Sequence, residues 1–326
     1  MSKRYAVISV GTNSTRMLLA DVGFDVPHVD ATGSIGTRIG EGLGSEGQLG
    51  AEPMRRTLDA IGQLYRQVRG KYVKLFAIAT SALRRAGNGD EFLERARDIL
   101  GAPVRVLSGE EEAEASYRGA ITALGPLRGE RVAAIDIGGG STEYAAGTST
   151  KPEQVFSCEI GAVRLTEALP ALAGRDGAVD AETIERARKM VREALAPLHG
   201  SEPVERAAFV GGSATTAAAI ARARKGTVDS YPLSRAELQA VLARLCALSL
   251  DDRKKVVGMR PQRADILPAG IVVLDTVLET LKLDTAVATA ADLLLGVVLQ
   301  HRDATATSAG EGKPVIAGSR TPKGFT

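Results

Sequence analysis

The sequence predicts an α/β fold with two similar halves around a cleft. A short pattern occurs twice, at Ile8–Thr15 and at Ile135–Thr142, and each copy lies between two hydrophobic runs. Segments of strand length and segments of helical period follow each copy. The chain of 326 residues also exceeds the usual size of a single hydrophobic core.

Each copy of the pattern is expected to form a tight turn between two strands. These strands are Tyr5–Val10 with Met17–Val22, and Val132–Ile137 with Tyr144–Ala146. Glycine permits such a turn because it takes positive φ without steric cost. The turn leaves backbone N–H groups in a concavity beside Ser and Thr hydroxyls, which favours an anion such as phosphate. One copy alone is compatible with an ordinary hairpin, but two copies with matched flanks favour phosphate binding.

The first half continues with alternating strands and helices. The expected elements are a strand between Val29 and Ile39, helix Glu52–Val68, strand Val73–Ala79, helix Asp90–Leu100, strand Val104–Leu107 and a helix that begins at Ser108. The order βββαβαβα resembles the ribonuclease-H-like unit of the actin, sugar-kinase and Hsp70 superfamily. The resemblance implies two such domains that flank an interdomain cleft.

The second half repeats this plan. The expected elements after the second turn are strands Glu143–Ala146 and Val155–Glu159, helix Ala181–Leu195, strand Ala207–Val210, a helix that ends near Arg224, helices Arg235–Leu245 and Arg263–Leu281, strand Thr285–Thr289 and helix Asp292–His301. A third glycine turn, Gly211–Thr215, precedes the helix that ends near Arg224. The N-terminus of that helix offers unpaired N–H groups to an anion.

The predicted domain boundary lies between Leu124 and Arg128, where Gly125 and Pro126 break a helix. The expected domains are residues 1–124 and 125–302. Residues 303–326 are small, polar and rich in Gly and Pro without an apolar period, so they are expected to form a flexible tail.

Composition limits the class of protein. The net charge of +2 is too small to indicate nucleic-acid binding, and no apolar stretch reaches the length of a membrane span. The absence of a signal-peptide pattern and two isolated cysteines, Cys158 and Cys246, predict a cytoplasmic protein. Basic residues cluster near predicted loops and helix ends, where they form either a solvated face or a surface for an extended polyanion: Arg84-Arg85, Arg222, Arg224-Lys225, Lys254-Lys255, Arg260 and Arg263.

The motifs together resemble the exopolyphosphatase/guanosine pentaphosphate phosphohydrolase family, in a short two-domain form. The segments that carry the resemblance are Val10–Ser14, Ala79–Arg84 with Asn88, Ser108–Ala113, Asp136–Glu143, Gly161–Glu167 and Gly211–Ser213. They run in family order over residues 5 to 300. Longer members have further C-terminal domains, including a histidine- and aspartate-rich one that the three histidines of this chain could not supply.

The resemblance implies two catalytic residues and a metal site. Glu112 matches the family's catalytic glutamate and is expected to accept a proton from the attacking water. A purely structural role is the alternative, because acids are favoured in a first helical turn and Ser108 with Glu111 forms a capping-box pattern. Arg84 matches an arginine that meets substrate phosphate. Asp136 and Glu143 lie across one turn and are expected to hold Mg²⁺ or another divalent cation.

The glycine turns supply the expected phosphate-binding residues. These are Gly11, Thr12, Asn13, Ser14, Arg16, Gly138, Gly139, Gly140, Ser141, Thr142, Gly211, Gly212 and Ser213. Two positions depart from the family pattern. Ser9 stands where the family has Asp, which removes one charge from the expected metal site. Leu293–Gly296 replaces a Leu-Arg-Glu-Gly pattern, which substitutes apolar residues for an Arg–Glu pair.

The expected function is hydrolysis of terminal phosphate from inorganic polyphosphate. Guanosine pentaphosphate 5′-phosphohydrolysis is an alternative, because guanosine penta- or tetraphosphate carries similar phosphate groups. A non-catalytic alarmone or polyphosphate sensor is another, which Ser9 favours, whereas the Glu112 motif argues against a kinase. The protein is expected to be a homodimer without nucleic-acid or membrane partners.

Overall fold

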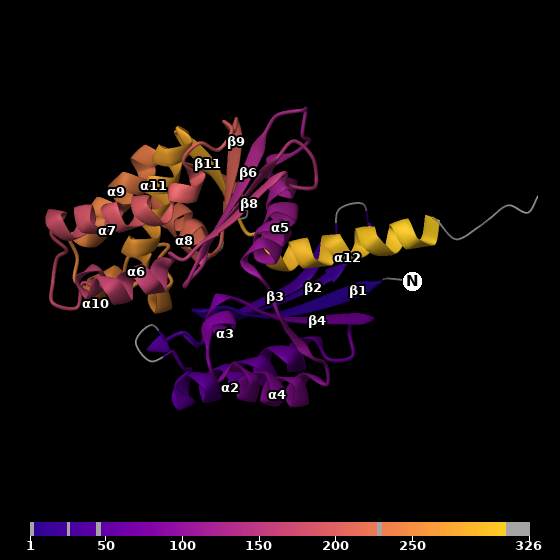
Figure 1. The fold of residues 1–326 in the computed structure, drawn as a ribbon. Coiled ribbons are helices and arrows are strands. Elements are labelled where there is room, and N and C mark those ends of the chain that lie inside the picture. Colours follow the sequence, from indigo (N-terminus) through magenta and orange to yellow (C-terminus); the bar gives the residue numbers. More distant parts are fainter. Residues whose placement is uncertain (1–2, 25–26, 44–46, 227–229, 311–326) are drawn as a thin grey trace, which may run out of the picture.

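Two β-sheets, each with helices on its faces, make up the protein (Figure 1). The computed structural model describes residues 3–24, 27–43, 47–226 and 230–310. The first half contains strands β1 Arg4–Val10, β2 Ser14–Asp21, β3 His28–Gly36, β4 Lys74–Ala79 and β5 Val104–Val106, and helices α2 Ala51–Val68, α3 Ser81–Arg85, α4 Gly89–Leu100 and α5 Gly109–Ala120.

The second half contains more and shorter helices. Its strands are β6 Val132–Ile137, β7 Thr142–Gly147, β8 Gln154–Cys158, β9 Arg206–Val210, β10 Ser230–Ser234 and β11 Thr285–Thr289, and its helices are α6 Ala162–Ala168, α7 Ala181–Ala194, α8 Gly212–Ala221, α9 Arg235–Cys246, α10 Leu250–Arg253, α11 Leu267–Leu281 and α12 Leu293–Gly310. Helices α3, α6 and α10 were not predicted, because seven residues or fewer do not establish a helical period. Strand β10 was not predicted either, and it contains Pro232, which counts against a strand.

Both sheets are built around the same hairpin. The first has the order β3-β2-β1-β4-β5, and the second has the order β10-β11-β9-β6-β7-β8. Strand β1 pairs antiparallel with β2 and parallel with β4, and β6 likewise pairs antiparallel with β7 and parallel with β9. The predicted α/β fold, with two units of one plan, is confirmed.

Two helices pack on the sheet of the other half. Helix α5 follows the first sheet in sequence, but its buried Ala113 and Tyr117 pack in a core with residues of β6, β7 and β9. Helix α12 follows the second sheet, but it lies beside the first (Figure 1). Its residues Leu294 and Val298 pack in a core with residues of β1 and β2. The chain therefore crosses between packing units before α5 and before α12. The predicted boundary between Leu124 and Arg128 lies between α5 and β6, after the first of these crossings.

Helix α12 also runs further than predicted. It extends to Gly310 instead of ending at His301, and Asp303 Oδ2 accepts a hydrogen bond from Arg118 Nη2 of α5 at 2.6 Å. Residues 303–310 are thus helical and do not belong to a flexible tail, because contacts with α5 extend the helix. The remainder of the predicted tail, 311–326, lies outside the described residues.

Helices α5 and α12 touch at their backbones, which fixes the position of both. A Cβ atom on Gly296 would lie 1.7 Å from the carbonyl oxygen of Ala115, and one on Gly119 would lie 2.2 Å from the carbonyl oxygen of Asp292. Only glycine fits such an approach. Because Glu112 lies on α5 and Asp292 directly precedes α12, this crossing places two acidic side chains of the cleft described below.

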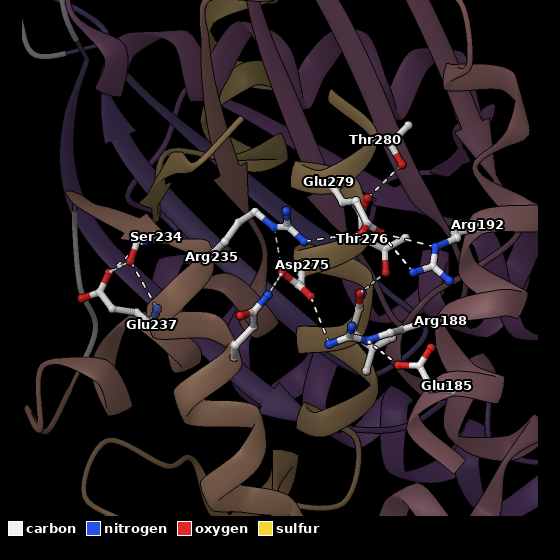
Figure 2. A network of polar contacts seen from close by, with 12 residues as sticks. Glu185, Arg188, Arg192, Ser234, Arg235, Glu237, Asp275, Thr276, Glu279 and Thr280 are labelled. Carbon is white, nitrogen blue, oxygen red and sulfur yellow. Dashed lines mark hydrogen bonds and ion pairs between the residues drawn. The ribbon is translucent and has the colours of Figure 1, made fainter. Parts of the chain in front are cut away.

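A polar network joins three helices of the second half (Figure 2). Asp275 of α11 accepts hydrogen bonds from Arg235 Nε of α9 at 3.0 Å and from Gln239 Nε2 at 3.2 Å. Arg188 of α7 forms an ion pair with the same carboxylate at 3.3 Å. Asp275 is buried and therefore shielded from water. Side chains of α7 and α9 compensate its charge instead.

Candidate active site

A cleft of about 870 Å³ lies between the two halves, and most of the predicted site residues line it. The predicted residues that line it are Gly11, Thr12, Asn13, Ser14, Arg16, Glu112, Asp136, Gly138, Gly139, Gly140, Ser141, Glu143, Gly211 and Gly212. Arg84, Thr142 and Ser213 are not among the lining residues. Thr142 donates its hydroxyl hydrogen to the carbonyl oxygen of Ile160 at 2.6 Å.

The two glycine turns have the same geometry. Gly11 N donates to Ser14 O at 3.0 Å, and Gly138 N donates to Ser141 O at 3.0 Å. The internal repeat in the sequence is therefore a repeat in structure, and it places two turns with backbone N–H and hydroxyl groups at the same cleft.

The reason for glycine in these two turns differs from the expected one. Of the turn glycines, only Gly211 has positive φ, at 91°. In the other turns glycine is required by close packing: a Cβ atom on Gly140 would lie 3.0 Å from Thr12 Oγ1 and 2.8 Å from Ser81 Oγ. The turns from the two halves are thus in contact. Ser81 Oγ is buried beside them without a hydrogen-bond partner among the described residues, and Ser81 lines the cleft.

Asp136 and Glu143 are direct neighbours across the β6–β7 hairpin. Asp136 Oδ2 accepts a hydrogen bond from Ser116 Oγ at 2.7 Å, and Glu143 Oε1 accepts one from Ser157 Oγ at 3.1 Å. Burial raises the pKa of Asp136 to about 6, with a further contribution from the charge of Asp292. Burial and the charges of Glu112 and Asp136 hold the pKa of Glu143 well above its usual range.

The donor set of this carboxylate pair fits a divalent cation. Neither Asp136 nor Glu143 forms an ion pair with a described residue, and a bound cation would compensate their charges. Mg²⁺ is commonly held by one or two carboxylates with substrate phosphates and water. Within the described ranges, no group of three or more His, Cys, Asp or Glu side chains is placed to hold a metal. A metal here would therefore depend on oxygen ligands from substrate and solvent.

Glu112 lies in the first turn of α5 and lines the cleft. The capping box is formed by Ser108 and Glu111, so Glu112 is not needed to cap the helix. The Glu112 side chain is buried and forms an ion pair with Arg84 Nη1. Burial raises the pKa of Glu112 to about 7, although the Arg84 guanidinium opposes the shift. A carboxylate with such a pKa is suited to general-base catalysis near neutral pH.

Arg84 contacts Glu112 instead of facing the cleft. Its Nη1 also donates to the carbonyl oxygen of Leu107 at 2.7 Å, directly before α5. The guanidinium thus joins the end of the first sheet to the carboxylate of Glu112. In this geometry Arg84 holds the Glu112 carboxylate. The contact with substrate phosphate that the sequence predicts for Arg84 stays a prediction.

Arginines from remote segments form one wall of the cleft. Arg16, Arg260 and Arg263 all line it. The Arg263 guanidinium lies against the N-terminus of α8, since a Cβ atom on Gly212 would be 2.0 Å from Arg263 Cζ. Burial and the charges of Arg260 and Arg16 lower the pKa of Arg263 to about 9. Mutually repelling, partly buried cations at a helix N-terminus create a site that favours an anion.

Sequence reasoning did not assign Arg260 and Arg263 to this site. Arg263 was expected to begin a long helix, but a 3₁₀ turn, Pro261–Arg263, precedes α11 and leaves the side chain free to enter the cleft. The cluster of basic residues near a helix end was the available signal. The departure at Leu293–Gly296 is explained by packing, because Leu293, Leu294 and Leu295 lie in the core beneath the first sheet.

The fold and the cleft define a phosphate-binding α/β enzyme with two units of one plan. The family model of the Ppx/GppA phosphatase family matches residues 27–300, and the chain belongs to this family. The predicted family and the predicted hydrolase class are therefore confirmed. None of the described helices has the length and apolar character of a membrane span.

Relatives of known name and structure agree with this assignment. The chain is 33% identical over 325 residues to exopolyphosphatase 2 of Mycobacterium tuberculosis, covering 91% of this chain and 98% of that protein. It resembles the crystal structure of an exopolyphosphatase from Cytophaga hutchinsonii with TM-score 0.84 and 25% identity, covering 93% and 98% of the two chains. The Aquifex aeolicus Ppx-GppA enzyme gives TM-score 0.76 and 26% identity, covering 92% and 100%.

Proposed function

We propose that this protein is an exopolyphosphatase that hydrolyses terminal phosphate from inorganic polyphosphate. The observation that carries the proposal is the position of Glu112, a buried carboxylate with raised pKa in a cleft whose other walls are phosphate-binding turns and arginines. The names of the relatives described above support the choice of substrate. Phosphoanhydride hydrolysis requires a base, a cradle for phosphate oxygens and compensating positive charge. Glu112, the glycine turns and the arginines of the cleft are proposed to supply them.

Each group has a role in the proposed reaction. Glu112 Oε accepts the proton of the attacking water, and Arg84 keeps this carboxylate in place. Turn N–H groups and hydroxyls hold the non-bridging oxygens, and Arg16, Arg260 and Arg263 balance their charge. Asp136 and Glu143 would hold Mg²⁺, which when bound supplies positive charge to phosphate oxygens and favours ionisation of water.

Guanosine pentaphosphate is the second candidate substrate. Val257 is 42% exposed and lines the cleft together with Met259, so these side chains offer an apolar surface to a purine. The cleft lining contains no Phe, Tyr, Trp or His from the described residues. A purine base would therefore bind without an aromatic side chain to stack on. For this reason we favour polyphosphate over the nucleotide as the main substrate.

Phosphate release from purified protein with Mg²⁺ tests the proposal. Polyphosphate, guanosine pentaphosphate and ATP are supplied in parallel, and kcat/KM is compared. The expected result is highest kcat/KM for polyphosphate and least for ATP. Higher kcat/KM for guanosine pentaphosphate would support the second candidate, and binding without release of phosphate would support a sensor. Either result would overturn the proposed function.

A further inference from the structure

We infer that a lysine-bearing loop at the far end of α8 is a subsite for the interior phosphates of a linear polyphosphate chain. The loop comprises residues 254–258 and is called the lysine loop here. Lys254 and Lys255 line the same cleft as the phosphate-binding turns, as does Lys225, four residues after the end of α8. The inference rests on the proposed function and adds a preference for long chains over short ones.

The position of the lysine loop follows from its contact with α8. Gly212 begins α8 at the reaction site, next to Arg263. Gly258 packs on the other end of this helix, since its Cβ atom would lie 2.5 Å from the carbonyl carbon of Ala219. From Gly212 to Ala219 the helix rises about 10 Å at about 1.5 Å per residue. A phosphate chain held at the N-terminus of α8 must therefore extend beyond its terminal phosphate to reach the loop.

A fully buried arginine anchors the start of the lysine loop. Arg253 Nε donates to Leu245 O at 2.7 Å, and its Nη1 donates to Leu172 O at 2.8 Å. These carbonyls lie near the C-terminus of α9 and in a 3₁₀ helix, and Leu245 O also accepts a backbone hydrogen bond from Leu248 N at 3.2 Å. The guanidinium lies over Gly174, where a Cβ atom would be 2.5 Å from Nη2. Lys254 and Lys255 follow this anchor directly, so their backbone is held in place at the cleft.

The lysine side chains themselves remain available to a ligand. Lys254 Nζ lies 2.8 Å from Asp251, and Lys255 Nζ lies 2.8 Å from Asp252. The two lysine side chains are 44% and 75% exposed, and exposed pairs of this kind contribute little because water screens them. A polyphosphate chain carries a high density of negative charge and competes effectively with one carboxylate for each lysine.

Chain length should therefore change affinity. A long chain contacts both the reaction site and the lysine loop, and the additional ion pairs lower its KM. Tripolyphosphate ends near the reaction site and does not gain these contacts. The bond that is hydrolysed is the same in both substrates, so kcat should depend little on the lysine loop.

The test uses the full chain with Lys254→Gln and Lys255→Gln combined. KM and kcat are measured for long-chain polyphosphate and for tripolyphosphate at low and high salt. At low salt, KM for the long chain is expected to rise about tenfold, equivalent to about 1.4 kcal/mol, with KM for tripolyphosphate unchanged. The effect should shrink at high salt. Lys151→Gln with Lys189→Gln removes the same charge outside the cleft lining and should change neither KM.

Two further measurements separate the possible failures. The variant Lys254→Arg with Lys255→Arg retains both charges and should keep the low KM for the long chain. If substitution at these positions disturbed folding, KM would rise in this variant too. Equal KM changes for both substrates, or none for the long chain, would overturn the inference. If no substrate releases phosphate, the proposed function fails. Direct binding of long-chain polyphosphate to the parent and the Gln variant then decides the inference, which equal affinities would overturn.

Discussion

Arg16 on β2 forms an ion pair with Asp292, the residue that directly precedes α12. Across the β1–β2 hairpin, Arg16 is the partner of Ser9, as Glu143 is the partner of Asp136 across the β6–β7 hairpin. The two repeats therefore carry different chemistry at equivalent positions. The second hairpin presents a carboxylate pair, whereas the first presents a hydroxyl and a guanidinium with a carboxylate supplied from a distant segment.

Exchange of charges between positions 9 and 292 tests this relationship. Asp292→Asn should lower kcat about tenfold without raising KM, because Arg16 loses its orienting partner while the cleft becomes more positive. Adding Ser9→Asp to this variant should recover most of kcat, because the new carboxylate lies beside Arg16 on the neighbouring strand. Steady-state kinetics of the parent, both single variants and the double variant provide the measurement. A double variant no better than Asp292→Asn would contradict the compensation.

The Glu112→Gln variant should lose phosphate release while it retains polyphosphate binding. The amide keeps the shape of the side chain but cannot accept a proton, so kcat should fall by roughly 10²–10⁴-fold. Arg84→Met should lower kcat less, because it leaves the base in the cleft without its holding contact. Turnover of Glu112→Gln within tenfold of the parent would exclude Glu112 as the base.

The metal requirement should respond to Asp136 and Glu143. Asp136→Asn and Glu143→Gln each remove a formal charge from an oxygen-ligand site and should raise the Mg²⁺ concentration needed for half-maximal activity. Mg²⁺ binding measured by calorimetry on the same variants gives a second readout. Glu110→Gln is a matched control, since Glu110 is exposed in the first turn of α5 and does not line the cleft. Unchanged metal dependence in both site variants would place the metal elsewhere.

The sequence predicted the strands and turns of the cleft well because these are local features. Strands β6 and β11 have the predicted bounds, since each is a short, mostly apolar run that follows a charged residue. The glycine turns were recognised from their repetition. Their requirement for glycine was explained incorrectly, because the close contact between Gly140 and Thr12 joins the two halves of the chain.

Residues that depend on tertiary contacts could not be predicted from local patterns. Arg16 and Asp292 are 276 residues apart, and only the return of α12 to the first sheet brings them together. Arg263 enters the cleft because a 3₁₀ turn replaces the expected start of a helix. The packing of α5 on the second sheet likewise depends on contacts between halves.

The Asp275 network should contribute to the stability of the second half. Asp275→Asn leaves Arg188 and Arg235 without their shared carboxylate, so the free energy of unfolding should fall by roughly 2–4 kcal/mol. Urea unfolding followed by circular dichroism measures this change. Asp59→Asn is the control: its pair with Arg55 is exposed and should contribute less than about 1 kcal/mol. Equal losses in both variants would show that burial of Asp275 does not strengthen its ion pairs.

His301 should make the packing of α12 sensitive to acid. Its ring contacts Tyr5 and Phe76, with centroids 5.4 Å and 4.9 Å away. Burial and the charges of Lys74 and Lys3 lower the pKa of His301 below its ordinary value. The unfolded chain therefore binds a proton at higher pH than the folded protein does. Stability is retained above the unfolded pKa of about 6.5 and is lost as pH falls through the folded pKa.

The measurement compares the free energy of unfolding of the parent with that of His301→Phe at pH 8 and pH 5. The variant keeps an aromatic ring against Tyr5 and Phe76 but cannot be protonated, so it should gain stability relative to the parent at pH 5. Glu112 and Asp136 have raised pKa values, so their contribution to the stability of the protein falls as pH rises. This pH dependence is opposite to that of His301. Their contribution is common to both proteins and cancels in the difference. The same difference at both pH values would show that protonation of His301 does not weaken the packing of α12.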